Sequence, residues 1–183
     1  MNKLVFLVGE SGCGKTTLQN NLIKYNPNIF TNIISSTTRD IRDGEECGKD
    51  YHFVDQEAFD KLDLTQSVTF GGNSYGTELK EFQKKEPVGL FIVTSEGVYD
   101  TINALKERGI DVDYQVIFFL TSKRLLASHN VDEERIARGN IQGDFLNKYV
   151  LGEFFDIPVS VVSDSDIDYE LRHNVKNIIL NGI

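Results

Sequence analysis

The glycine-rich stretch near the start of the chain is Gly9-Glu10-Ser11-Gly12-Cys13-Gly14-Lys15-Thr16-Thr17. An apolar run, residues 4–8, precedes it, and a stretch with helical spacing of apolar residues, 17–24, follows it. The spacing G-x-x-x-x-G-K-[ST] between a strand and a helix is typical of a phosphate-binding loop. Glycines let backbone amides turn toward an anion, and the helix N-terminus adds partial positive charge. We therefore predict a phosphate cradle here, rather than a glycine-rich turn with a chance lysine.

Two side chains of this loop have predicted roles. Lys15 would reach the outer phosphates of a nucleotide, and the hydroxyl of Thr16 would bind Mg²⁺. Cys13 is most simply a small loop residue, because neither it nor Cys47 has metal-ligand spacing and two cysteines make no disulfide framework.

The chain enters a strand at once and has no apolar run of membrane-spanning length, so we expect a cytoplasmic, reducing environment.

The composition narrows the possible partners. With 183 residues, of which 40% are hydrophobic and 26% charged, one soluble domain with small inserts is expected. The net charge of −9 argues against a general binder of nucleic acid or membrane surfaces, which needs a basic face. An acidic protein that binds nucleotides must concentrate its cations at the site, so local clusters of arginine and lysine are the informative feature.

The remaining pattern alternates strands and helices, which predicts a parallel sheet with helices on both faces. The expected strands are residues 30–34, 50–54, 90–93, 116–120 and 158–162, with a hairpin from 68–70 and 74–77. The expected helices run from Asp55 to Leu62, over 98–108, and from Asp166 toward the C-terminus. His52, His129 and His173 are scattered and are expected to be surface or packing residues.

Two polar stretches could contribute to a second site. Residues 35–45 are rich in hydroxyls, too much so for a core element, and contain Arg39 and Arg42. Guanidinium groups suit phosphate oxygens, so this stretch could bind a second anion, or it could be a solvated loop with surface ion pairs. Residues 122–147 are helical and charged, and could form a mobile lid or an ordinary pair of amphipathic helices.

These segments together resemble the guanylate kinases, over most of the chain. After the glycine-rich loop come Ser-Ser-Thr-Thr-Arg at 35–39, Arg-Asp-Gly-Glu at 42–45 and Gly-Lys-Asp-Tyr-His-Phe-Val at 48–54, in that order. A Gly-Asn-x-Tyr-Gly match follows at 72–76. The resemblance implies an α/β fold, with a P-loop three-layer core made of residues 1–32, 83–121 and 148–183. It also implies a small β-rich monophosphate-binding insert, 33–82, and a short helical lid, 122–147.

The resemblance further implies ATP-dependent phosphorylation of GMP or dGMP to GDP or dGDP. ATP and Mg²⁺ would be the cofactors, and small nucleotides the partners of a monomer or homodimer. The ATP phosphates would be held by Gly9, Ser11, Gly12, Cys13, Gly14, Lys15, Thr16 and Thr17. The acceptor phosphate would be gripped by Ser35, Arg39, Arg42, Tyr51 and Tyr75, with Glu45 holding Arg39 or Arg42. Thr77 would reach the base, and Arg135 or Arg138 would close over the transferring group.

The chain departs from the family pattern at the positions expected to contact the base and the metal. Gln66 stands where the family has a carboxylate, and Ile92 and Thr94 stand where it has two aspartates. An amide offers guanine one acceptor where a carboxylate accepts from both of its donors. Two alternatives therefore stay open: a divergent module that binds a nucleotide or a partner with little or no kinase activity, and a related kinase with another acceptor base.

Overall fold

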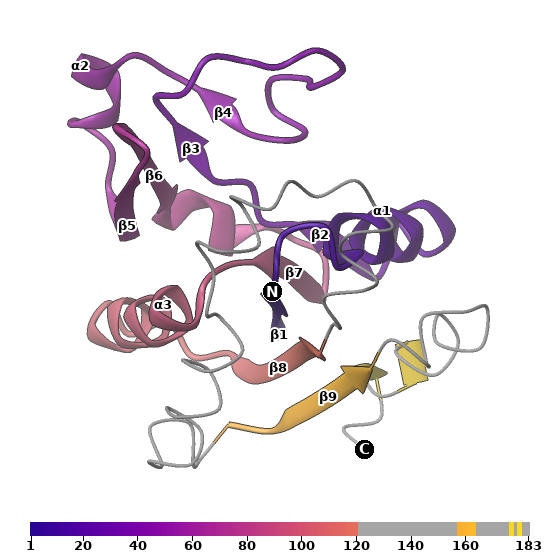
Figure 1. The fold of residues 1–183 in the computed structure, drawn as a ribbon. Coiled ribbons are helices and arrows are strands. Elements are labelled where there is room, and N and C mark those ends of the chain that lie inside the picture. The colour runs from indigo at the N-terminus through magenta and orange to yellow at the C-terminus, as the bar shows by residue number, and fades with distance from the viewer. Residues whose placement is uncertain (121–156, 164–175, 178, 181–183) are drawn as a thin grey trace.

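A five-stranded parallel sheet forms the core of the computed structural model, which describes residues 1–120, 157–163, 176–177 and 179–180 (Figure 1). The strand order is β2-β7-β1-β8-β9, and every neighbouring pair is parallel. The strands are β1 (Lys3–Gly9), β2 (Phe30–Asn32), β7 (Val88–Ile92), β8 (Asp113–Leu120) and β9 (Val159–Ser163). Strand β1 lies in the middle, so the glycine-rich loop that follows it emerges at the centre of the sheet.

Helices α1 (Lys15–Tyr25) and α3 (Ser95–Glu107) lie against opposite faces of this sheet (Figure 1). Successive side chains of a strand point to opposite faces, and β1 follows this rule. Val5 and Leu7 pack in one buried cluster with residues of α1, and Leu4 and Phe6 pack in the other with residues of α3. The predicted parallel sheet with helices on both faces is confirmed.

The second sheet is small and is formed between residues 36 and 78. Its order is β4-β3-β6-β5, from β3 (Ser36–Thr37), β4 (His52–Phe53), β5 (Leu64–Phe70) and β6 (Asn73–Glu78). Gly71 and Gly72 join β5 to β6 with φ angles of 57° and 78°, as a tight two-residue hairpin requires. Helix α2 (Gln56–Phe59) and the short 3₁₀ helix η1 (Leu79–Gln83) complete this region. All of it falls inside 33–82, the range predicted for the insert, except the last residue of η1.

One expectation about this region is wrong. The hydroxyl-rich stretch 35–45 was expected to stay out of any core, yet Ser36 and Thr37 are fully buried in β3. The hydroxyl of Thr37 donates to the carbonyl of Ser74 on the adjacent strand at 2.9 Å. A buried hydroxyl with such a partner loses little on leaving water, so polarity alone did not exclude Thr37 from a core position.

Several element bounds also differ from the prediction. Helix α3 begins at Ser95 rather than 98, because the Thr94 side chain accepts a hydrogen bond from the Gly97 N–H at 3.2 Å and caps the helix. Helix α1 begins at Lys15, β2 ends at Asn32, and β5 begins at Leu64. Asp55 caps α2 as expected, through the Ala58 N–H at 2.8 Å, but that helix ends at Phe59.

Two predicted features lie outside the described residues. These are the lid, 122–147, with Arg135, Arg138 and His129, and the start of the terminal helix after Asp166, with His173. Helical residues are described at 176–177 and 179–180, and Ile179 is buried against the core sheet. In the parts of the chain that the structure describes, no helix is both long and apolar enough to cross a membrane.

Candidate functional site

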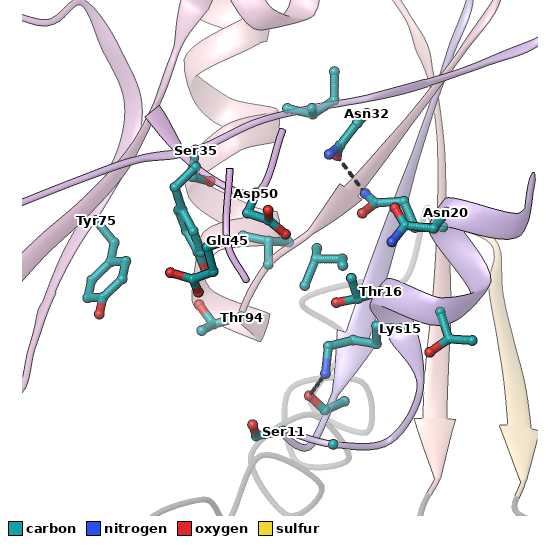
Figure 2. Close-up of a pocket in the computed structure, with 18 of the residues that line it drawn as sticks. Ser11, Lys15, Thr16, Asn20, Asn32, Ser35, Glu45, Asp50, Tyr75 and Thr94 are labelled. Atoms are coloured by element: carbon teal, nitrogen blue, oxygen red, sulfur yellow. Dashed lines mark hydrogen bonds between the residues drawn. The ribbon is translucent and has the colours of Figure 1, made fainter. Parts of the chain in front are cut away.

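A cleft lies between the two sheets, and the glycine-rich loop forms one of its walls (Figure 2). Its volume is about 1220 Å³. This exceeds the roughly 300–1,000 Å³ that is usual for one small ligand, so the cleft has space for two. The opposite wall comes from the second sheet and its loops, with Ser35, Arg39, Arg42, Tyr51 and Tyr75 among the lining residues.

The glycine-rich wall is shaped for an anion. Gly14 is the N-cap of α1, with a left-handed φ of 93°, and it carries no side chain that could occupy the first helical amides. Gly9 has a φ of 152°, and a Cβ there would lie 2.8 Å from the Cβ of Phe119. A side chain at either position would therefore strain or displace the loop. The first turn of α1 contains no acidic residue, which leaves its positive end unopposed from within the helix.

Lys15 points into this loop. Its ammonium donates to the carbonyls of Gly9 at 2.7 Å and Glu10 at 2.6 Å. These are neutral partners, so the lysine charge is not cancelled by an ion pair with either of them. Ser11, Gly12, Thr16 and Thr17 also line the cleft. Thr16, the predicted metal ligand, is exposed.

Cys13 differs from the other residues predicted to bind the cofactor. Its side chain is only 1% exposed and packs with Leu18 and Leu22 in the core beneath the loop. It is absent from the lining of the cleft, so its side chain is not placed to bind a phosphate. The thiol lies 3.4 Å from the Lys15 ammonium.

On the opposite wall, Arg39 is held by a carboxylate and by two aromatic rings. Its two terminal nitrogens donate to the two oxygens of Glu45 at 3.0 and 2.9 Å. The guanidinium carbon lies 5.5 Å from the ring centroids of both Tyr51 and Phe53. The hydrogen bond to Glu45 raises the pKa of Arg39, and the same bond lowers the pKa of Glu45. Both groups are therefore charged at neutral pH, and the arginine is fixed in place.

Another arginine and two tyrosines of this wall can donate hydrogen bonds to a ligand. Arg42 is exposed, and its backbone N–H also donates to Glu45 at 2.9 Å. The rings of Tyr51 and Tyr75 meet edge to face with centroids 6.1 Å apart. Burial raises the pKa of Tyr51, so its phenol keeps its proton. Arginines and hydroxyl groups gathered in this way can bind the oxygens of a second anion.

A short chain of side chains connects this wall to the strand β5. The Gln66 amide donates to the Thr77 hydroxyl at 3.0 Å, and that hydroxyl lies 2.8 Å from the hydroxyl of Ser35. Ser35 and Gln66 line the cleft, whereas Thr77 is fully buried behind them and does not. The predicted contact of Thr77 with a base would therefore have to pass through its two neighbours in this arrangement.

The carboxyl end of β7 forms the floor of the cleft. Ile92, Val93 and Thr94 line it there, beside the glycine-rich loop. Thr94, a predicted substrate-binding residue, is exposed and also serves as the cap of α3. No carboxylate stands at these three positions, so a metal ion at this strand end would lack a protein anion from them.

Sequence reasoning missed several residues of the cleft. Val68 and Phe70 line it and are 47% and 54% exposed, which is unusual for large apolar side chains. Their spacing from Gln66, two and four residues, places all three side chains on one face of β5. The alternation of side chains between the two faces of a strand was therefore the signal that could have found them. Gln19 and Asn32 also line the cleft, but no motif marks them. The fold is that of an α/β protein of the P-loop type, and its cleft has two walls, each with groups suited to an anion.

Comparison with known proteins identifies the family. A family model described as guanylate kinase matches residues 1–94. The guanylate kinase of Prochlorococcus marinus subsp. pastoris (strain CCMP1986 / NIES-2087 / MED4) is 36% identical, with 97% of each chain covered. Human guanylate kinase is 34% identical over 71% of this chain and 69% of its own length. The crystal structure of guanylate kinase from Anaplasma phagocytophilum superimposes with a TM-score of 0.64 at 22% identity, covering 99% of this chain and 86% of that one.

The chain therefore belongs to the guanylate kinase family and is a nucleoside monophosphate kinase.

Proposed function

We propose that this enzyme transfers the γ-phosphoryl group of ATP to GMP or dGMP, forming GDP or dGDP. The observation that carries the proposal is the cleft, in which the phosphate loop of α1 faces a wall of arginines and tyrosines. Relatives that are named guanylate kinase and match nearly the whole chain support guanine as the acceptor base.

The glycine-rich wall, which we call the donor wall because it would hold the phosphate donor, suits a nucleoside triphosphate with magnesium. Among the described residues, no cluster of three or more histidine, cysteine, aspartate or glutamate side chains could hold a metal ion. Mg²⁺ commonly keeps its waters and binds through one or two protein groups together with substrate phosphates. The exposed Thr16 hydroxyl fits that pattern, and Mg²⁺ bound there would neutralise charge on the ATP phosphates.

The residues of the cleft would act by positioning and by neutralising charge. Lys15 would exchange its two loop carbonyls for phosphate oxygens of ATP, and Arg39 and Arg42 would hold the acceptor phosphate in line. An oxygen of that phosphate then bonds to the γ-phosphorus while the bond from the γ-phosphorus to the bridging oxygen breaks. The attacking phosphate oxygen carries no proton that must be removed, so no general base is required. Arg135 and Arg138 would serve as the lid arginines.

The base would lie beside Gln66 and Thr94. Because the Gln66 NH₂ donates to Thr77, its carbonyl oxygen is the atom left for a ligand. Guanine presents two kinds of donor at N1 and at the exocyclic amino group. One amide oxygen can satisfy the first of them well, but not both. We therefore expect GMP to bind with modest discrimination against bases that lack the exocyclic amino group.

A coupled assay for ADP release, run with each common nucleoside monophosphate, tests this function. We expect turnover with GMP and dGMP well above that with AMP, CMP or UMP. The variant K15M serves as the control for contaminating kinases, and its turnover should be lower than that of the wild type by on the order of 10²–10³-fold. Folded protein that binds ATP and GMP but forms no GDP would overturn the proposal in favour of a binding module without catalysis.

We further propose a cellular compartment and an oligomeric state for the enzyme. The two cysteines, Cys13 and Cys47, are both free thiols, which suits a reducing compartment such as the cytoplasm. The partners would be the nucleotides themselves, and the protein would act as a monomer or a homodimer. Gel filtration with light scattering distinguishes these two states.

A further inference from the structure

Asn32 stands where the core sheet gives way to the second sheet. It is the last residue of β2, and the chain enters β3 only four residues later. The chain segment that leaves the second sheet passes beside Asn32, and the Lys84 ammonium of that segment donates to the Asn32 carbonyl oxygen at 2.6 Å. Lys84 is paired in turn with the buried carboxylate of Glu81, which also accepts from the Ile34 N–H. The backbone of Asn32 is therefore held at the entrance to the insert by the segment that leads out of it.

The side chain of Asn32 connects two regions of the cleft, helix α1 and the loop at Lys49, whose distance from each other is not fixed by a direct covalent connection. Its oxygen accepts from the Gln19 amide at 2.7 Å (Figure 2). Its NH₂ donates to the backbone carbonyl of Lys49 at 3.1 Å. Gln19 belongs to α1, one helical turn after Lys15, and Lys49 stands two residues before Tyr51. We refer to Gln19, Asn32 and the Lys49 carbonyl as the amide bridge.

The orientation of both amides is determined by the groups around them. The Gln19 NH₂ also donates to the carbonyl of Leu90 at 2.9 Å, and a backbone carbonyl can only accept. The Lys49 carbonyl imposes the same condition on the NH₂ of Asn32. With both NH₂ groups assigned in this way, the oxygen of Asn32 faces the NH₂ of Gln19, as the bridge requires. Gln19 is only 3% exposed, so its position is held by the core.

We propose that Asn32 is a positioning residue that sets the distance between the ATP phosphates on α1 and the acceptor phosphate on the insert. The bridge joins the helix that carries Lys15 and Thr16 to the loop that carries Asp50 and Tyr51, and all four of these residues line the cleft. Phosphoryl transfer depends on the two phosphates meeting in line, and a misplacement of about 1 Å can cost on the order of a hundredfold in rate. Each substrate would still bind its own wall without the bridge, but the two would meet less often in the reactive arrangement.

The proposal rests on the proposed kinase reaction and predicts a specific split in the kinetics. N32A should lower kcat by about tenfold to a hundredfold. The dissociation constants of ATP and GMP, each measured alone by calorimetry, should stay within about twofold of wild type, because neither wall loses a contact. The backbone bond from Lys84 remains in N32A, so the thermal unfolding midpoint should change little. N28A, at an exposed asparagine in the turn before β2, is the matched control and should behave as wild type.

Two further variants test the bridge itself. N32D keeps an oxygen for Gln19 but has no donor for the Lys49 carbonyl, so it should lose as much kcat as N32A. Q19M removes the other half of the bridge at nearly constant volume, together with the bond to the Leu90 carbonyl. The double variant Q19M/N32A should have about the kcat of the slower single variant, because the bridge can be broken only once. N32D and Q19M also carry the test if N32A does not fold.

Three results would overturn the inference. They are an unchanged kcat in folded N32A, additive losses in the double variant, and weaker binding of both nucleotides in parallel with a lower unfolding midpoint. An absence of turnover in the wild-type enzyme would instead overturn the proposed function and this inference with it. Wild-type turnover with an unaffected N32A overturns the inference alone.

Discussion

The two walls of the cleft hold their cations in opposite ways. Lys15 is bonded to two neutral carbonyls of its own loop, whereas Arg39 is bonded to both oxygens of Glu45 and lies over two aromatic rings. A lysine with neutral partners can transfer its hydrogen bonds to a phosphate without leaving an anion unpaired. An arginine fixed by a carboxylate offers its remaining N–H groups in a set position. The donor wall is therefore adaptable. The opposite wall, which carries Arg39 and which we call the acceptor wall, is organised before the ligand arrives.

The largest expected effect comes from removing the adaptable cation. K15M should lower kcat by on the order of 10²–10³-fold, because a charge aimed at the transferring phosphoryl group is lost. GMP affinity, measured by calorimetry, should be unchanged, because Lys15 belongs to the other wall. An equal weakening of GMP binding would show that the two walls do not act separately.

The next effect comes from loosening the fixed cation while keeping its charge. R39K should raise KM for GMP by about tenfold to a hundredfold, because a lysine cannot make the two-pronged bond to Glu45 and lacks the planar group that contacts the rings of Tyr51 and Phe53. Steady-state kinetics at saturating ATP measures it. The matched control is R108K, at an arginine paired with Asp63 away from the cleft, which should leave KM unchanged.

A smaller effect is expected where the acceptor wall meets the base. Q66E replaces one acceptor oxygen with two, so it should tighten GMP binding by up to about tenfold and leave IMP, which lacks the exocyclic amino group, nearly unchanged. The ratio of kcat/KM for GMP to that for IMP measures this selectivity. Equal changes for both nucleotides would mean that Gln66 does not contact the exocyclic group.

The smallest expected effect concerns pH. Hydrogen bonding to Arg39 lowers the pKa of Glu45 below its ordinary value of 4.5. A carboxyl whose pKa is lower in the folded state stabilises the fold above its unfolded pKa, and this stabilisation is lost as the pH falls through the folded value. The unfolding midpoint of wild type should therefore fall more steeply below about pH 4.5 than that of E45Q. Parallel midpoint curves for the two proteins would contradict the assigned ion pair.

Much of the site could be predicted because its signals are local. The glycine-rich loop, its flanking strand and the helix after it are contiguous, so spacing alone predicted the phosphate-binding wall. The run from Ser35 to Val54 is likewise compact, and the order of its short motifs is enough to indicate the family. Local capping also accounts for an error, since the Thr94 cap lets α3 begin at Ser95, three residues earlier than the apolar pattern suggested.

The sequence by itself therefore determined the fold class, the loop proposed to bind phosphate and the family to which the enzyme belongs. Only the tertiary structure decided which side chains are buried and which are hydrogen-bonded to residues distant in the sequence. The burial of Thr37 and Thr77, the burial of the Cys13 side chain in the core and the bridge from Gln19 through Asn32 to Lys49 all depend on it. The physical reason is that hydrogen bonds between residues distant in the sequence depend on how strands and helices pack, and no periodicity or motif encodes that packing.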